Sequence, residues 1–148
     1  MKVKYFDLKN KRVFITGGGS GIGASIVEHF CEQECEVYFV DINIKESKKL
    51  ISHLKKKKIK APHFIECNLL KIKKLKNIIK KIIKSKGPID ILINNAANDD
   101  RHSTKEVDEK YWNNRMDVNL KHFFFTIKAV LKGMIQKKGG AIVNLSSV

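Results

Sequence analysis

Hydrophobic and polar positions divide the chain into short apolar runs that alternate with longer amphipathic stretches. The apolar runs predict strands over residues 11–16, 36–41, 62–67, 89–93 and 141–145. Apolar residues at three- and four-residue spacing predict helices over residues 21–33, 44–57, 72–86, 106–114 and 115–138. Strands that alternate with helices in this way are typical of an α/β fold with a parallel sheet.

Two segments are especially regular. The segment before Gly87-Pro88 carries lysines between its apolar residues, which are Ile72, Leu75, Ile78, Ile79, Ile82 and Ile83. The run at 89–93 is apolar except for Asp90, as expected of a strand that helices cover on both faces.

In the last helix the run Phe123–Phe125 is wider than one packing face needs, so we expect part of this helix to meet a partner subunit. Trp112 is expected to be buried.

The segment at 13–23, VFITGGGSGIG, has the chemistry of a phosphate-binding turn between a strand and a helix. Gly17 can adopt backbone angles that other residues avoid, Gly21 leaves room for a pyrophosphate, and Gly23 lets the helix pack closely. The first N–H groups of the helix have no partners within it, so they attract an anion.

The second predicted strand ends at Asp41, at the distance from the glycine turn where a dinucleotide-binding fold places its ribose-binding acid. A carboxylate there accepts hydrogen bonds from the adenosine ribose. It would repel the 2'-phosphate of NADP, so the sequence favours NAD as the cofactor.

Four ordered motifs resemble those of the short-chain dehydrogenase/reductase family. They are TGGGSGIG at 16–23, NNAA at 94–97, DVNL at 117–120 and NLSS at 144–147. The resemblance covers the whole chain and implies a Rossmann-type doubly wound parallel sheet. Residues 1–148 would form the NAD-binding domain, with only the N-terminal five-strand portion of the family's fold.

The resemblance also assigns roles to individual residues. Asn94 braces the sheet, Ser147 bonds the substrate oxygen, and Asn119 binds a water that links the active-site lysine to solvent. The expected cofactor-binding residues are Gly17, Gly19, Ser20, Gly21, Ile22, Gly23, Asp41, Ile42, Asn68, Leu69, Asn95, Ala96 and Ala97. Asn68 departs from the usual Asp, and Ala97 from the usual Gly.

The segment at 98–102, NDDRH, looks like the branch of the family that oxidises aldose sugars such as xylose. Its His102 is expected to be a surface residue. We therefore expect an NAD-dependent oxidoreductase that acts on a sugar or alcohol. The alternatives are a dinucleotide-binding protein without catalysis and part of a 3-oxoacyl-type carbonyl reductase.

The family's proton-transferring Tyr-x-x-x-Lys pair should follow the serine, and the 148 residues hold none after Ser147. We therefore expect an incomplete copy of the family's enzyme that is inactive and poorly soluble by itself. The family's members are usually homo-oligomers, and part of that interface would be missing.

Charge and composition add limits. The formal net charge is +15, with 27 Lys against 3 Arg spread over predicted helix faces, which favours a solvated surface over a nucleic-acid or acidic-lipid binding patch. The histidines at 29, 53, 63 and 122 show no ligand spacing, and the cysteines at 31, 35 and 67 lack Cys-x-x-Cys spacing, so we expect neither a metal site nor disulfides. No signal peptide or membrane segment is apparent, and a cytoplasmic protein is expected.

Overall fold

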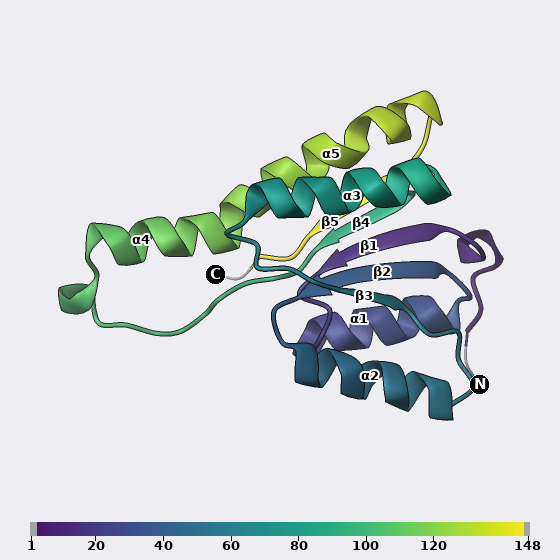
Figure 1. The fold of residues 1–148 in the computed structure, drawn as a ribbon, viewed down its shortest axis with the longest axis horizontal. Helices are drawn as coiled ribbons and strands as arrows, with labels where there is room; N and C mark the ends of the chain where they lie inside the picture. Colours follow the sequence, from purple (N-terminus) through teal and green to yellow (C-terminus); the bar gives the residue numbers. More distant parts are fainter. Residues whose placement is uncertain (1–2, 147–148) are drawn as a thin grey trace.

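The computed structural model describes residues 3–146, which fold around a five-stranded parallel sheet (Figure 1). Its strands, β1 (Arg12–Thr16), β2 (Glu36–Asp41), β3 (His63–Glu66), β4 (Ile91–Asn94) and β5 (Ala141–Asn144), lie in the order β3-β2-β1-β4-β5. Every neighbouring pair is parallel. The predicted α/β fold is confirmed, and the strand boundaries lie within two residues of those expected.

Helices cover both faces of the sheet. Figure 1 shows α1 (Gly21–Glu32) and α2 (Ile44–Lys56) on one face, and α3 (Ile72–Lys86) and α5 (His122–Gln136) on the other. Alternate residues of β1 belong to two separate hydrophobic cores, one on each face of the sheet. Phe14 packs beneath α3 and α5, whereas Val13 and Ile15 pack towards α1. The sheet is therefore doubly wound, as predicted. The cysteines are free thiols buried in these cores.

The region between β4 and α5 differs from the prediction. A 3-10 turn (Thr104–Glu106) precedes α4 (Glu109–Met116), and a π-helical turn (Asp117–Lys121) joins α4 directly to α5. The predicted boundary at 114/115 is wrong because backbone angles on both sides of the π turn remain helical. No described residue of α4 is buried, and Figure 1 shows the helix extending beyond the sheet. Trp112 is 60% exposed, so the prediction that it is buried is also wrong.

The outer face of α5 is apolar and solvent-exposed. Phe124 and Ile135 are 62% and 65% exposed, and Leu131 lies between them in the same shallow groove. The neighbouring β5 forms one edge of the sheet in the described residues. The predicted contact of this helix with a partner subunit stays a prediction. Among residues 3–146, no helix has the length and apolar character needed to cross a bilayer.

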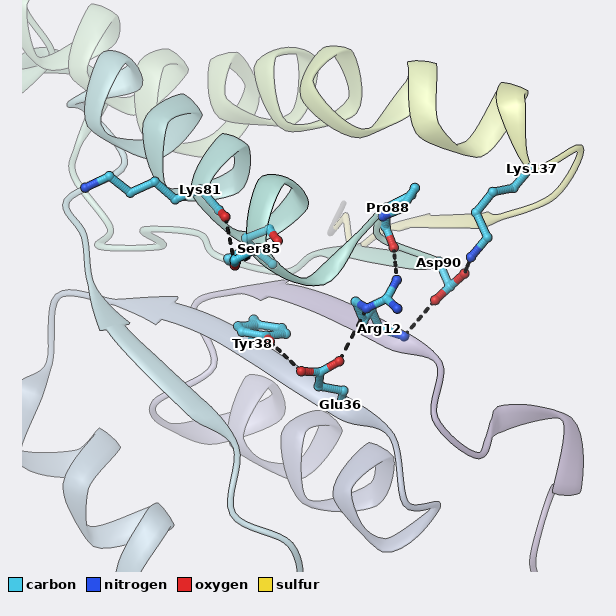
Figure 2. A network of polar contacts seen from close by, with 9 residues as sticks. Arg12, Glu36, Tyr38, Lys81, Ser85, Pro88, Asp90 and Lys137 are labelled. Carbon is cyan, nitrogen blue, oxygen red and sulfur yellow. Dashed lines mark hydrogen bonds and ion pairs between the residues drawn. The ribbon is translucent and has the colours of Figure 1, made fainter.

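A polar network ties β1, β4 and α5 together at the amino ends of the strands (Figure 2). The Asp90 carboxylate accepts a hydrogen bond from the backbone N–H of Arg12 at 2.8 Å and pairs with the ammonium of Lys137. The Arg12 side chain donates to the carbonyl of Pro88 at 2.7 Å and lies 3.3 Å from the carboxylate of Glu36. The single polar residue in the predicted strand at 89–93 thus links the start of β1, the start of β4 and the residue that follows α5.

Replacement of Asp90 by asparagine is expected to destabilise the fold by about 1–3 kcal/mol at pH 7, because the ion pair with Lys137 is lost. Burial alone would raise the pKa of Asp90, but the bonds from Lys137 and Arg12 outweigh it and hold that pKa below its ordinary value of 3.8. A lowered carboxyl pKa stabilises the folded state above the unfolded pKa and ceases to do so as the pH falls through the folded value. Urea unfolding of the parent and of Asp90→Asn should therefore give different free energies of unfolding at pH 7, and this difference should shrink below pH 3.8. A gap that persists unchanged in acid would contradict this account.

Charging the outer face of α5 is expected to reduce self-association. The double variant Phe124→Lys/Ile135→Lys should remain monomeric at higher concentration than the parent in light scattering, because a contiguous exposed apolar surface promotes association whereas a single exposed apolar residue does not. Its unfolding free energy should change by no more than about 0.5 kcal/mol, since both side chains face solvent. Phe6→Lys, which alters an 89% exposed phenylalanine elsewhere, is the control and should leave association unchanged.

Candidate functional site

The strand order reverses between β1 and β4, and we call the region at the carboxyl ends of these two strands the crevice. These strands are neighbours in the middle of the sheet, and the connections that follow them run to opposite faces. In open parallel sheets, ligands bind at such a reversal of strand order, because the diverging chains leave a gap there. The predicted glycine turn follows β1 here, and the predicted Asn95–Ala97 loop follows β4.

The glycine turn depends on backbone packing too close for side chains. Gly17 has φ +67°, and a Cβ atom there would lie 2.8 Å from the Cα of Ala96. At Gly23 a Cβ would lie 1.8 Å from the carbonyl oxygen of Gly17. The first turn of α1 is thereby pressed against the end of β1, as the sequence predicted.

The amino end of α1 is suited to an anion. Ser20 is the N-cap in extended conformation, and its side chain makes no capping bond. No acidic residue lies in the first turn of this described helix, and a Cβ at Gly21 would meet no atom within 4 Å. The positive end of the helix dipole therefore faces open space at the crevice. These features fit the pyrophosphate of a dinucleotide.

Asp41 is fixed beside the glycine turn. One carboxylate oxygen accepts the N–H of Gly19 at 2.7 Å, and the other accepts the N–H of Asn43 at 2.8 Å. A Cβ at Gly19 would lie 2.5 Å from the hydroxyl of Ser47 and 2.9 Å from this carboxylate. Each carboxylate oxygen can accept a further hydrogen bond. The predicted contact with a ribose thus agrees with the geometry and stays a prediction.

The loop after β4 is tied to the end of β1. The hydroxyl oxygen of Thr16 accepts the N–H groups of Asn95 and Ala96, at 3.0 and 3.1 Å. The Asn95 amide donates in return to the carbonyls of Thr16 and Gly17, at 3.1 and 2.9 Å. The Asn95–Ala97 loop therefore forms one wall of the crevice, with Ala97 exposed.

Asn94 braces the sheet, in the role that the resemblance implied. Its amide donates to the side-chain oxygen of Asn144 on β5 at 2.8 Å. Its own side-chain oxygen accepts the hydroxyl of Thr126 on α5 at 2.7 Å. One buried side chain thus connects β4 to the next strand and to the covering helix.

The other predicted cofactor-binding residues differ in accessibility. Ile22 and Ile42 are 69% and 68% exposed beside the turn, so their aliphatic side chains are open to a ligand. Asn68 is exposed after β3, with its side-chain oxygen accepting the N–H of Leu70 at 2.9 Å. Leu69 is buried in the core, so any contact with a cofactor would come through its main chain.

Asn119 lies in the π-helical turn, a local geometry that is frequent at functional sites. Its side-chain oxygen accepts the N–H of Asn98 at 2.7 Å, and its amide donates to the carbonyl of Asn98 at 3.0 Å. This pair clamps the loop after Ala97 to the helix. The role in catalysis that the resemblance assigns to Asn119 stays a prediction. The predicted Ser147 lies outside the described residues.

The 98–102 segment is held to α4. Arg115 donates to the carboxylate of Asp100 at 3.1 Å and stacks on the ring of Tyr111, whose hydroxyl donates to the carbonyl of Asp100. His102 is exposed, as expected of a surface residue, and its ring centroid lies 4.3 Å from that of Tyr111. Within residues 3–146, no group of three His, Cys, Asp or Glu side chains could hold a metal ion.

Two contributors to the site escaped the sequence analysis. Ser47 is fully buried on α2 behind Gly19, and His122 is fully buried on α5 behind Thr16. Neither carries a motif of its own. Ser47 falls on the inward face of a helix, and His122 begins the apolar stripe of α5, so only their placement against β1 and β2 reveals them.

Comparison with known proteins agrees with this geometry. The family model for short-chain dehydrogenases matches residues 11–148. D-xylose 1-dehydrogenase of Caulobacter vibrioides is 42% identical over 97% of this chain and 56% of its own length. The 3-oxoacyl-[acyl-carrier-protein] reductase of Staphylococcus epidermidis is 32% identical over 94% of this chain and 57% of its own.

A crystal structure of a gluconate 5-dehydrogenase from Burkholderia cenocepacia, in complex with NADP and tartrate, superposes with a TM-score of 0.80 at 27% identity. The match covers 94% of this chain and 54% of that one. The chain thus spans about half the length of the relatives it matches. With a family model that covers nearly all of its residues and a fold that agrees, the chain belongs to the short-chain dehydrogenase/reductase family.

Proposed function

We propose that this chain is the dinucleotide-binding part of an NAD-dependent oxidoreductase that acts on a sugar or alcohol. The observation that carries the proposal is the Asp41 carboxylate, which is bonded to the N–H of Gly19 in a glycine turn at the crevice. An anion-binding helix end and a ribose-binding acid occur together in dinucleotide sites. When bound, the nicotinamide supplies the hydride chemistry.

The preference for NAD rests on charge. Asp41 is a half-buried carboxylate at the end of β2, where an adenosine ribose would meet it. Two ribose hydroxyls can donate to its free lone pairs, whereas a 2'-phosphate would oppose it with a like charge. The gluconate 5-dehydrogenase structure contains NADP, so the family alone does not decide the cofactor and Asp41 carries the argument.

Protein groups around the crevice have separate tasks in this proposal. The amides at the start of α1 bind the pyrophosphate, and the Asn95–Ala97 loop supports the nicotinamide half. Ser147, in the motif that follows β5, bonds the substrate oxygen and steadies charge that develops there. Asn119 holds the loop that begins at Asn98 in place.

The substrate class rests on similarity to a sugar dehydrogenase. The Caulobacter D-xylose 1-dehydrogenase is 42% identical, against 32% for the 3-oxoacyl reductase, over similar shares of the chain. The polar segment at 98–102, which follows the Asn95–Ala97 loop and is tied to α4 through Arg115 and Asp100, offers hydrogen-bonding groups. Such groups suit a polyhydroxylated substrate better than an acyl chain.

Asp41→Ala is expected to weaken NADH binding about 10- to 100-fold, because hydrogen bonds to a charged acceptor and the support of Gly19 are lost together. The parent chain should bind NADH more tightly than NADPH in calorimetry. Asp41→Asn keeps the shape of the side chain without its charge, and should reduce the difference in affinity between NADH and NADPH. Asp7→Ala, which removes an exposed carboxylate before β1, at the opposite end of that strand from the glycine turn, is the matched control and should bind NADH as the parent does. A folded parent that binds neither dinucleotide would refute the proposal.

The hydride-transfer function can be tested by joining residues 1–148 to the part of the Caulobacter enzyme that lies beyond its match to this chain. We expect the chimera to form NADH from NAD and D-xylose, measured by absorbance. Ser147→Ala in the chimera should lower kcat about 10²- to 10³-fold, since one donor to the reacting oxygen is removed. Ser146→Ala is the control. A folded chimera that binds NADH without turnover would favour a binding protein without catalysis.

A further inference from the structure

A buried histidine stands directly behind the wall of the crevice. His122, the first residue of α5, has no exposed surface. Its Nε2 atom lies 3.2 Å from the hydroxyl oxygen of Thr16, and its Nδ1 atom lies 2.6 Å from the carbonyl oxygen of Val118. Its ring also packs edge-on against Phe123, at 4.6 Å between centroids. His122 therefore joins the helix to the strand end that carries the glycine turn.

The hydrogen-bond partners determine where the protons lie. A carbonyl oxygen can only accept, so the Nδ1 atom of His122 must carry a proton and donate to Val118. Burial lowers the pKa of His122 to about 4, against the opposing effect of the bond to Val118, so the ring is neutral near pH 7. A neutral ring with its proton on Nδ1 leaves Nε2 as an acceptor. The hydroxyl of Thr16 must therefore donate to it.

The same hydroxyl has two acceptor positions, and the loop uses both. Thr16 accepts the N–H groups of Asn95 and Ala96, which are the backbone of the crevice wall. A hydroxyl has one proton and two lone pairs, so these three bonds satisfy it completely. With a proton on Nε2, three donors would compete for two lone pairs, and the hydroxyl proton would lose its acceptor.

We infer that His122 is a positioning residue for the cofactor-binding loop. As the Nδ1-protonated tautomer, its Nε2 atom accepts a hydrogen bond from the Thr16 hydroxyl, which thereby directs both Thr16 lone pairs at the amides of Asn95 and Ala96. This role deepens the proposed function. Only its expected effect on dinucleotide affinity rests on that function. The hydrogen-bond relay itself is a property of the folded chain.

The tautomer can be read directly by nitrogen-detected NMR of the histidine rings at pH 7. We expect Nδ1 of His122 to resonate as a protonated nitrogen and Nε2 as an unprotonated one. The opposite tautomer, or a doubly protonated ring, would overturn the inference. Because no dinucleotide is present, failure of this test is distinct from failure of the proposed function.

Variants then test the effect on the loop. His122→Phe keeps a ring of similar size without an acceptor, and should speed hydrogen exchange at the amides of Asn95 and Ala96 and weaken NADH binding about 2- to 12-fold. His122→Gln can present an amide oxygen to the Thr16 hydroxyl. It should restore part of the protection of these two amides and part of the NADH affinity. Val130→Ala, a buried change on the same helix, is the control for lost stability and should leave these two amides unchanged.

A double-mutant cycle separates a relay from simple packing. Thr16→Val removes the hydroxyl, so a further His122→Phe change should add nothing to the exchange of the Asn95 and Ala96 amides. Additive effects of the two substitutions would show that His122 acts without Thr16, and would overturn the inference. Equal effects of His122→Phe and Val130→Ala on these amides would also overturn it.

Discussion

The site depends on β1 lying hydrogen-bonded on both sides in the middle of the sheet. Val13 is paired with Val37 of β2 and with Ile91 of β4, and residues 13–16 are fully buried. With both edges paired and both faces covered, the strand has one position available to it. The turn and the loop that form the crevice are anchored to its last residue, so their geometry follows from the register of this strand.

Close contact between backbones gives the crevice its form. Gly23 lies against the carbonyl of Gly17, and Gly17 lies against the Cα of Ala96. Gly19 lies against the side-chain carboxylate of Asp41. A side chain at these points would push α1 away from the strand end. Close packing leaves the amides at the start of α1 facing solvent and a carboxylate fixed beside them, which is the charge distribution that a dinucleotide needs.

Two further walls of the crevice are held by different means. The Asn95–Ala97 loop is bonded to the sheet through Thr16, whereas the segment after it is bonded to the continuous helix through Asn119 and Arg115. This helix leaves the sheet at α4, where no described residue is buried, and exposes an apolar face along α5. The Asn95–Ala97 loop is therefore bonded to the buried central strand, whereas the segment after it is bonded to α4 and the π turn, in which no described residue is buried.

The sequence by itself determined the alternation of strands and helices, the glycine turn and the acid at Asp41, because period and glycine spacing are local properties of the chain. The prediction for Trp112 failed because burial of a helical residue depends on whether the sheet extends beneath that helix. The predicted start of the long helix failed because a π turn continues a helix without any helix-breaking residue. Only the tertiary structure brought His122 to Thr16, 106 residues away, and closed the hydrogen bonds that fix the ring's proton. Such pairings arise from packing between distant elements, which no local pattern records.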